Sequence, residues 1–146
     1  RWIIHTLIDS VSKGGNFMIT LGPDAEGNFH PKAVTAMEDA GRWLKTNGEA
    51  IYATRERPGL LWKEGENVRF TRSKDHKHVY AMCLDWPGKT LELKTVRPRE
   101  GSGIRLLGVD QLLKWQRPGD RVVIDLPDSP PASHAYAFKI ENGEPK

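Results

Sequence analysis

HVYAMCL, residues 78–84, is the stretch that decides the fold of the second half of the chain. The run is almost entirely apolar and contains β-branched and aromatic side chains. It lacks the alternation of a strand with one wet face, which is typical of a central strand buried on both sides. TLELK, residues 90–94, does alternate and indicates a half-exposed strand. We therefore expect inner and outer strands of a layered β-structure.

Similar short runs continue on both sides of this stretch, separated by Gly, Pro and Asp turns at spacings of about ten residues. About eight such runs predict an antiparallel β-sandwich. The expected strands are Leu60–Lys63, Val68–Arg72, His78–Leu84, Thr90–Val96, Ile104–Val109, Leu112–Gln116, Arg121–Leu126 and Ala135–Ile140.

The first 52 residues follow a different pattern. Residues 2–13 carry apolar side chains at the spacing of one helical face. The segment SKGGNFMITLGP, residues 12–23, then ends that helix at its paired glycines. Phe17–Leu21 is a nearly continuous apolar run and predicts a strand buried on both faces, as in a parallel sheet. Gly22-Pro23 ends this strand because proline cannot donate to a ladder.

A second helix is predicted from Pro31 to Asn47-Gly48. Two helices around a single strand cannot form an independent fold, so we expect residues 1–52 to be the end of a larger α/β domain. Residues 53–146 would form the sandwich. A chain that starts inside an amphipathic pattern is also expected to be a fragment of a longer protein.

Composition excludes several classes of protein. The chain has 22 Lys and Arg against 19 Asp and Glu, and these cations are scattered, which does not favour nucleic-acid binding. No apolar run approaches the roughly 18 residues of a membrane helix. Cys83 is the single cysteine, so an internal disulfide and a cysteine-based zinc site are excluded. Its place within a predicted strand indicates an inert core thiol.

Polar residues with catalytic or metal-binding potential are few. His76 and His78 could face one side of a strand, but no third ligand is evident, and a solvated turn is favoured. His5 and Asp9 stand four residues apart on the first helix, which favours a surface pair over a catalytic pair. Neither a metal nor a cofactor is expected.

Trp62, Trp86 and Trp115 lie in the predicted sandwich and leave two alternatives open. Exposed tryptophans could stack on sugar rings, which would make the domain a carbohydrate-binding module. Buried tryptophans would instead indicate a sandwich that braces its neighbouring domain.

Several blocks of the sequence resemble the α-L-fucosidases of glycoside hydrolase family 29. In the first part they are LIDSVSKGGNF (7–17), LGPD (21–24) with Gly27, and Gly41-x-Trp43-Leu44-x-x-NGEAIYAT, which ends with residues 47–54. In the second part they are VYA (79–81), Leu84-x-Trp86-Pro87, LG (107–108), LKW (113–115), LP (126–127) and PP (130–131). The resemblance spans nearly the whole chain.

This resemblance implies a (β/α)8-like catalytic barrel followed by a β-sandwich. Residues 1–52 would hold the last βα unit of the barrel with its preceding helix, and residues 53–146 the C-terminal sandwich. The family is retaining, with an Asp nucleophile and a Glu acid/base that lie upstream of the matched region. No residue of this chain therefore inherits a catalytic role, and fucosylated glycans would bind through the rest of the barrel. The parent would be extracytoplasmic: periplasmic, secreted or lysosomal.

The resemblance also points to Thr20 and Asp24 as substrate-binding candidates. The family commonly has Asn at the position of Thr20, and Thr lacks the paired donor and acceptor of an amide. Barrel active sites lie at the C-terminal ends of the strands, so the loop after Leu21 would face substrate. Asp24 is the best polar candidate there. The alternative is that Asp24 and Asn28 simply shape the turn before Pro31.

Overall fold

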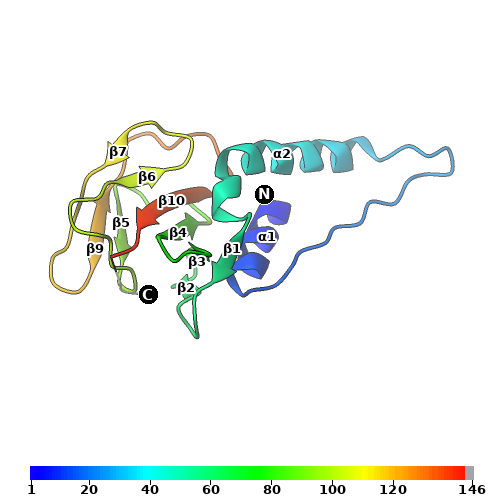
Figure 1. The fold of residues 1–146 in the computed structure, drawn as a ribbon. Coiled ribbons are helices and arrows are strands. Elements are labelled where there is room, and N and C mark those ends of the chain that lie inside the picture. The colour runs from blue at the N-terminus through cyan, green and yellow to red at the C-terminus, as the bar shows by residue number, and fades with distance from the viewer. Residues whose placement is uncertain (144–146) are drawn as a thin grey trace.

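The computed structural model describes residues 1–143. It contains helices α1 (Trp2–Ser12) and α2 (Pro31–Asn47) and the short 3-10 helix η1 (Gly48–Ala50), followed by β-structure (Figure 1). The strands are β1 (Thr54–Glu56), β2 (Lys63–Glu64), β3 (Val68–Ser73), β4 (His78–Cys83), β5 (Thr90–Leu93), β6 (Ile104–Leu106), β7 (Leu112–Leu113), β8 (Trp115–Gln116), β9 (Val122–Asp125) and β10 (Tyr136–Glu141).

The strands form two antiparallel sheets, as the sequence predicts. The larger sheet has the order β1-β3-β4-β10-β6-β7, with β2 paired to β3, and the smaller has the order β5-β9-β8. HVYAMCL supplies β4, which lies between β3 and β10 in the register Phe70–Ala81–Phe138. Each of the eight predicted strands overlaps an observed one. The run 112–116 divides into β7 and β8, and β1 is additional.

Apolar side chains from both sheets form the main core. Phe70 and Phe138 of the larger sheet and Leu93 and Ile124 of the smaller are fully buried between the layers. Cys83 also lies in this core, and burial raises the pKa of its thiol to about 12. The prediction of an inert core thiol is therefore confirmed.

The helices cover the opposite face of the larger sheet and create a second core. Ile4 and Ile8 of α1 and Trp43 of α2 pack against Tyr80 and Met82 of β4. Figure 1 shows the resulting order of layers, with the helices on one side of the larger sheet and β5 and β9 on the other. Because β4 is covered on both faces, it has no wet side, which explains its unbroken apolar pattern.

The strand predicted at Phe17–Leu21 is not formed, which corrects the sequence-based expectation. Residues 13–30, here called the arm, run outward from α1 and return to α2 as an extended loop (Figure 1). A strand needs a neighbour to receive its backbone hydrogen bonds, and no part of residues 1–143 pairs with this run. The side chain of Met18 consequently is 87% exposed. The described structure contains the flanking helices of the expected βα unit without its sheet.

Across residues 1–143, no helix combines the length and the apolarity that a bilayer crossing requires.

Candidate functional site

Asp24, the first substrate-binding candidate, closes the turn at the far end of the arm. Its Oδ1 atom accepts hydrogen bonds from the backbone N–H groups of Glu26 at 3.1 Å and Asn28 at 2.7 Å. The backbone N–H of Asp24 in turn donates to the carbonyl oxygen of Asn28 at 2.9 Å. The carboxylate thus shapes its own loop, as an Asx turn does. A role for Asp24 toward substrate stays a prediction.

Thr20, the second candidate, lies on the outgoing side of the arm. Its side chain is exposed, and its hydroxyl has no hydrogen-bond partner within residues 1–143. The arm also leaves apolar side chains in solvent, including Met18 and the 48% exposed Phe29. Clustered exposed apolar side chains mark surfaces that other protein segments cover. Thr20 therefore places a polar hydroxyl among the exposed apolar side chains of the arm.

Trp62 packs beneath the root of the arm instead of standing free. Its indole is half-buried, and three cations approach the ring. The Nζ atoms of Lys13 and Lys63 lie 4.8 Å and 5.4 Å from the ring centroid, and the Arg69 guanidinium lies 5.3 Å from it. Such contacts are favourable cation–π interactions. The indole therefore has a packing role between α1 and the larger sheet.

The other two candidate tryptophans are also half-buried with protein partners. Trp86 meets Tyr136 edge to face, with ring centroids 4.9 Å apart. Trp115 packs against the main core, and its Nε1–H donates to the carbonyl oxygen of Ser102 at 2.7 Å. The three indoles lie in three different settings and do not form one platform. Sugar stacking at these positions stays a prediction.

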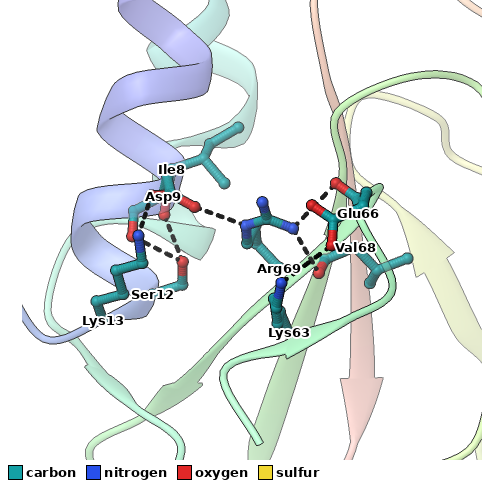
Figure 2. A network of polar contacts seen from close by, with 8 residues as sticks. All are labelled: Ile8, Asp9, Ser12, Lys13, Lys63, Glu66, Val68 and Arg69. Carbon is teal, nitrogen blue, oxygen red and sulfur yellow. Dashed lines mark hydrogen bonds and ion pairs between the residues drawn. The ribbon is translucent and has the colours of Figure 1, made fainter. Parts of the chain in front are cut away.

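A charged network joins α1 to β3 at the root of the arm (Figure 2). The Arg69 side chain is 9% exposed, and its Nε donates to Oδ1 of Asp9 at 2.7 Å. Its Nη1 donates to the backbone carbonyls of Glu66 and Val68. Asp9 also binds Lys13, four residues along the same helix. We call Asp9, Lys13, Trp62 and Arg69 the arm clamp.

The electrostatics of Asp9 reflect these two cations. Partial burial pushes the pKa of its carboxyl upward, but hydrogen bonds from Lys13 and Arg69, together with their charges, outweigh burial and hold that pKa below 3.8. The predicted surface pair between His5 and Asp9 is wrong. His5 instead has its Nε2 atom 2.7 Å from the carbonyl oxygen of His134. Asp9 prefers Lys13 because opposite charges four residues apart on a helix attract.

A second polar cluster joins η1 to the larger sheet. The Tyr80 hydroxyl donates to Glu49 Oε1 at 2.9 Å, and Lys139 forms an ion pair with the same carboxylate. Burial opposes ionisation of Glu49, yet the bonds from Lys139 and Tyr80 lower its pKa overall. Burial and the Glu49 carboxylate raise the pKa of Tyr80. This cluster keeps its charges paired and has the character of a structural contact.

Two cavities open beside the helices. One, of about 540 Å³, lies between α2 and residues 131–136, with Trp43 and Tyr136 in its lining. The other, of about 420 Å³, is bounded by Glu49, His78 and neighbouring charged side chains. Both lie along the seam between the helical segment and the sandwich.

The described side chains do not assemble a metal site. Within residues 1–143, no group of three or more His, Cys, Asp and Glu side chains is placed to hold a cation. His76 stands in the turn before β4 with a φ of 62°, where its ring contacts Nη1 of Arg72. His78 begins the strand itself, and burial with the nearby Lys139 charge lowers its pKa.

The chain resembles known proteins along nearly its whole length. Residues 1–49 match the family described as alpha-L-fucosidase, and residues 63–141 match the alpha-L-fucosidase C-terminal domain. The tissue alpha-L-fucosidase of Homo sapiens is 34% identical over 144 residues, covering 94% of this chain and 30% of that protein.

Solved structures share the fold. Alpha-L-fucosidase isoenzyme 1 from Paenibacillus thiaminolyticus superimposes with a TM-score of 0.83 at 22% identity, over 98% of this chain and 34% of that chain. The GH29 alpha-L-fucosidase from Bacteroides thetaiotaomicron superimposes with a TM-score of 0.78 at 22% identity, over 94% of this chain and 31% of that chain.

A β-sandwich packed against two helices, matched by a family model over residues 63–141, defines the class of the chain as a C-terminal domain of the kind that alpha-L-fucosidases carry. The chain belongs to the α-L-fucosidases of glycoside hydrolase family 29, through the C-terminal domain of that family. It spans about 30% of the length of the curated relatives it matches.

Sequence reasoning missed the residues that hold the helical segment to the sandwich. The contact between Asp9 and Lys13 could have been found from their four-residue spacing. Arg69 gave no signal, because a single arginine in a β-strand is usually solvated. Arg57, buried and bonded to Thr95, was missed because arginines are seldom buried.

Proposed function

We propose that this chain is the C-terminal portion of a retaining α-L-fucosidase that removes terminal α-linked L-fucose from glycans. The observation that carries this proposal is the ordered match of two fucosidase families to residues 1–49 and 63–141. The relatives contain about three times the length of this chain. The remaining length is enough for a catalytic barrel.

In this proposal, residues 1–52 are the end of the barrel and residues 53–146 are the sandwich, of which residues 144–146 lie outside the described part of the chain. The structure supports the division, because η1 ends at Ala50 and β1 begins at Thr54. The exposed apolar side chains of the arm supply a second argument. In the complete enzyme the run Phe17–Leu21 would pair with the other barrel strands, which would cover Met18 and its neighbours.

The chemistry would reside in the rest of the barrel. A retaining glycosidase needs two carboxyl groups about 5 Å apart, one as nucleophile and one as acid/base. The carboxylates with defined roles in this chain are already engaged: Asp9 in the arm clamp, Asp24 in its turn and Glu49 with Lys139. The chain alone would therefore have no hydrolase activity.

The contribution of this chain would be to place the arm and to brace the barrel. Thr20 and Asp24 would lie at the substrate face, since barrel active sites form at the carboxyl ends of strands. The sandwich would support this face from below by burying Ile4, Ile8 and Trp43 against the larger sheet. The partners would be fucosylated glycans and the remainder of the catalytic domain, with neither nucleic acid nor membrane involved.

An extracytoplasmic location is part of the same proposal. Relatives of the chain carry the names tissue and plasma alpha-L-fucosidase. The single cysteine, Cys83, is a buried free thiol, so it would be protected from oxidation in an oxidising compartment.

The direct test is to assay the complete coding sequence on an aryl α-L-fucoside and to follow the released sugar by proton NMR. We expect cleavage, with α-L-fucose as the first anomer to appear. Initial release of the β-anomer would refute retention. The absence of any cleavage, with a correctly folded enzyme, would refute the fucosidase assignment.

A carbohydrate-binding sandwich remains the alternative from another class. It would require a sugar to reach Trp62, Trp86 or Trp115, which already have protein partners. Titration of the tryptophan fluorescence with fucosylated oligosaccharides separates the two readings. We expect no shift at millimolar sugar, and a saturable shift abolished by one Trp→Ala change would favour the binding module.

A further inference from the structure

Arg69 is a buried cation that bridges the larger sheet and the C-terminal end of α1. Its guanidinium lies against the Trp62 ring and donates to two carbonyl oxygens of its own strand region and to Asp9. A buried charge needs a partner of opposite sign and a fixed geometry. Asp9 is the single carboxylate among the described residues with which Arg69 forms an ion pair. The larger sheet therefore fixes the position of this one side chain on α1.

Asp9 stands one turn before the point where the arm begins. Helix α1 ends at Ser12, whose buried hydroxyl donates to the carbonyl oxygen of Ile8. The chain then turns at Gly14, which has a φ of 79°. A Cβ atom there would lie 3.0 Å from the carboxylate of Glu56 in β1. The arm thus leaves α1 beside the exposed side chain of Glu56 on the sheet.

In the complete enzyme the neighbouring barrel strands would hold the run Phe17–Leu21, so a rotation at this root would act by shifting where and at what angle the arm enters that sheet. The ten steps along the backbone from Gly14 to Asp24 span at most about 33 Å at roughly 3.3 Å per residue. A rotation of about 5° at the root would then displace the tip by about 3 Å. Displacements of about 1 Å already impair the placement of a substrate. Apolar contacts at Ile4 and Ile8 hold the helix in place, but they are less directional than a charged hydrogen bond.

We propose that the ion pair between Asp9 and Arg69 sets the direction of the arm, and that both are positioning residues for the substrate site to which Thr20 and Asp24 belong. This inference rests on the proposed fucosidase function. The sandwich is then more than a passive support, because a side chain of β3 determines where a loop of the catalytic domain points. Figure 2 shows the arrangement, with Arg69 reaching from the sheet to Asp9 and Lys13 bound to the same carboxylate.

The test uses the complete enzyme and separates positioning from stability. Asp9→Asn leaves Arg69 buried without its counter-charge, and we expect it to lower the melting temperature. The double variant Asp9→Asn with Arg69→Met also removes the buried Arg69 charge that lost its partner, so stability should recover. If the pair positions the arm, KM for an aryl α-L-fucoside should remain raised in the double variant by about tenfold, with kcat changed less than KM. If KM returns to the wild-type value with stability, the proposal is refuted.

Asp85→Asn is the matched control. Asp85 pairs with Arg1 at the other end of α1, where both side chains are exposed. This variant breaks a link between the same helix and the same sandwich away from the arm. We expect KM and the melting temperature to stay at the wild-type values, and a rise in KM equal to that of the double variant would refute a specific role for Asp9.

Hydrogen exchange distinguishes failure of the clamp from failure of the proposed function. Amides of residues 13–16 should exchange faster in the double variant than in the wild-type enzyme, whichever substrate the enzyme uses. Unchanged exchange would refute the clamp. A wild-type enzyme that does not cleave fucosides, but shows the expected exchange difference, would refute the function and leave the clamp standing.

Discussion

Gly108 provides a quantitative test of the contact between α2 and the sandwich. Its φ is 85°, and a Cβ atom there would lie 2.6 Å from Cγ2 of Thr46 on α2. Gly108→Ala therefore carries two costs. The left-handed backbone costs an alanine about 1–2 kcal/mol, partly offset by about 0.4–1 kcal/mol because the unfolded chain is stiffened. The steric clash adds about 1 kcal/mol, since the exposed Thr46 can give way in part.

Gly119→Ala is the matched control, because Gly119 has a φ of 67° but an added Cβ would meet nothing within 4 Å. We expect a loss of about 1 kcal/mol for Gly119→Ala and about 2 kcal/mol for Gly108→Ala. For a chain of this size, these losses lower the melting temperature by about 3 °C and about 6 °C. Thermal unfolding followed by circular dichroism measures both.

Thr46→Ala completes the cycle by removing the methyl group that Gly108→Ala would meet. In that background Gly108→Ala should cost no more than Gly119→Ala, which corresponds to a coupling of about 1 kcal/mol. Equal losses for the two glycines in the wild-type background, with no coupling to Thr46, would refute the reasoning. The loop after β6 would then not abut α2.

Three further results are expected. The Cys83 thiol, with its pKa raised to about 12 by burial, should react with a thiol reagent at pH 8 only after unfolding, and rapid labelling of the folded chain would contradict its place in the core. The pKa of Asp75 is lowered to about 2 by hydrogen bonds from the Ser73 hydroxyl and the Lys77 N–H. An NMR titration should show this midpoint, and Ser73→Ala should move it toward 3.8; a wild-type midpoint near 3.8 would exclude these bonds. Because the pKa of Asp9 is depressed in the folded state, its stabilising effect is complete above 3.8 and is lost as pH falls through the folded value. The wild-type chain should therefore lose more stability on acidification below about pH 4 than the double variant Asp9→Asn with Arg69→Met, and parallel pH curves would contradict the ion pair.

The β-sandwich was predictable because its patterns are local. Each strand carries its own run of apolar residues, and the turns between them carry Gly, Pro and Asp. The central position of HVYAMCL followed from its unbroken apolar character, which the two layers around β4 explain. Strand β1 was missed because Thr54–Glu56 has only three residues, all of them polar, including the buried Thr54.

The strand expected at Phe17–Leu21 shows where local patterns fail. An apolar run indicates that a segment is buried in the folded protein, but it does not show that the segments that bury it belong to the same chain. No strand within residues 1–143 pairs with this run, so Met18 and Thr20 are exposed and Phe17, Ile19 and Leu21 are only partly covered. The Asx turn of Asp24 was foreseen as an alternative, because Asp and Asn favour such turns. The arm clamp was not, since it depends on a contact between residues 60 positions apart.

The central claim is that this chain is the supporting C-terminal portion of an α-L-fucosidase whose catalytic groups lie elsewhere in the protein. Its most direct test compares the complete enzyme with the isolated 146-residue chain on the same aryl α-L-fucoside. We expect turnover by the complete enzyme and none by the chain alone. Measurable turnover by the chain alone would contradict it.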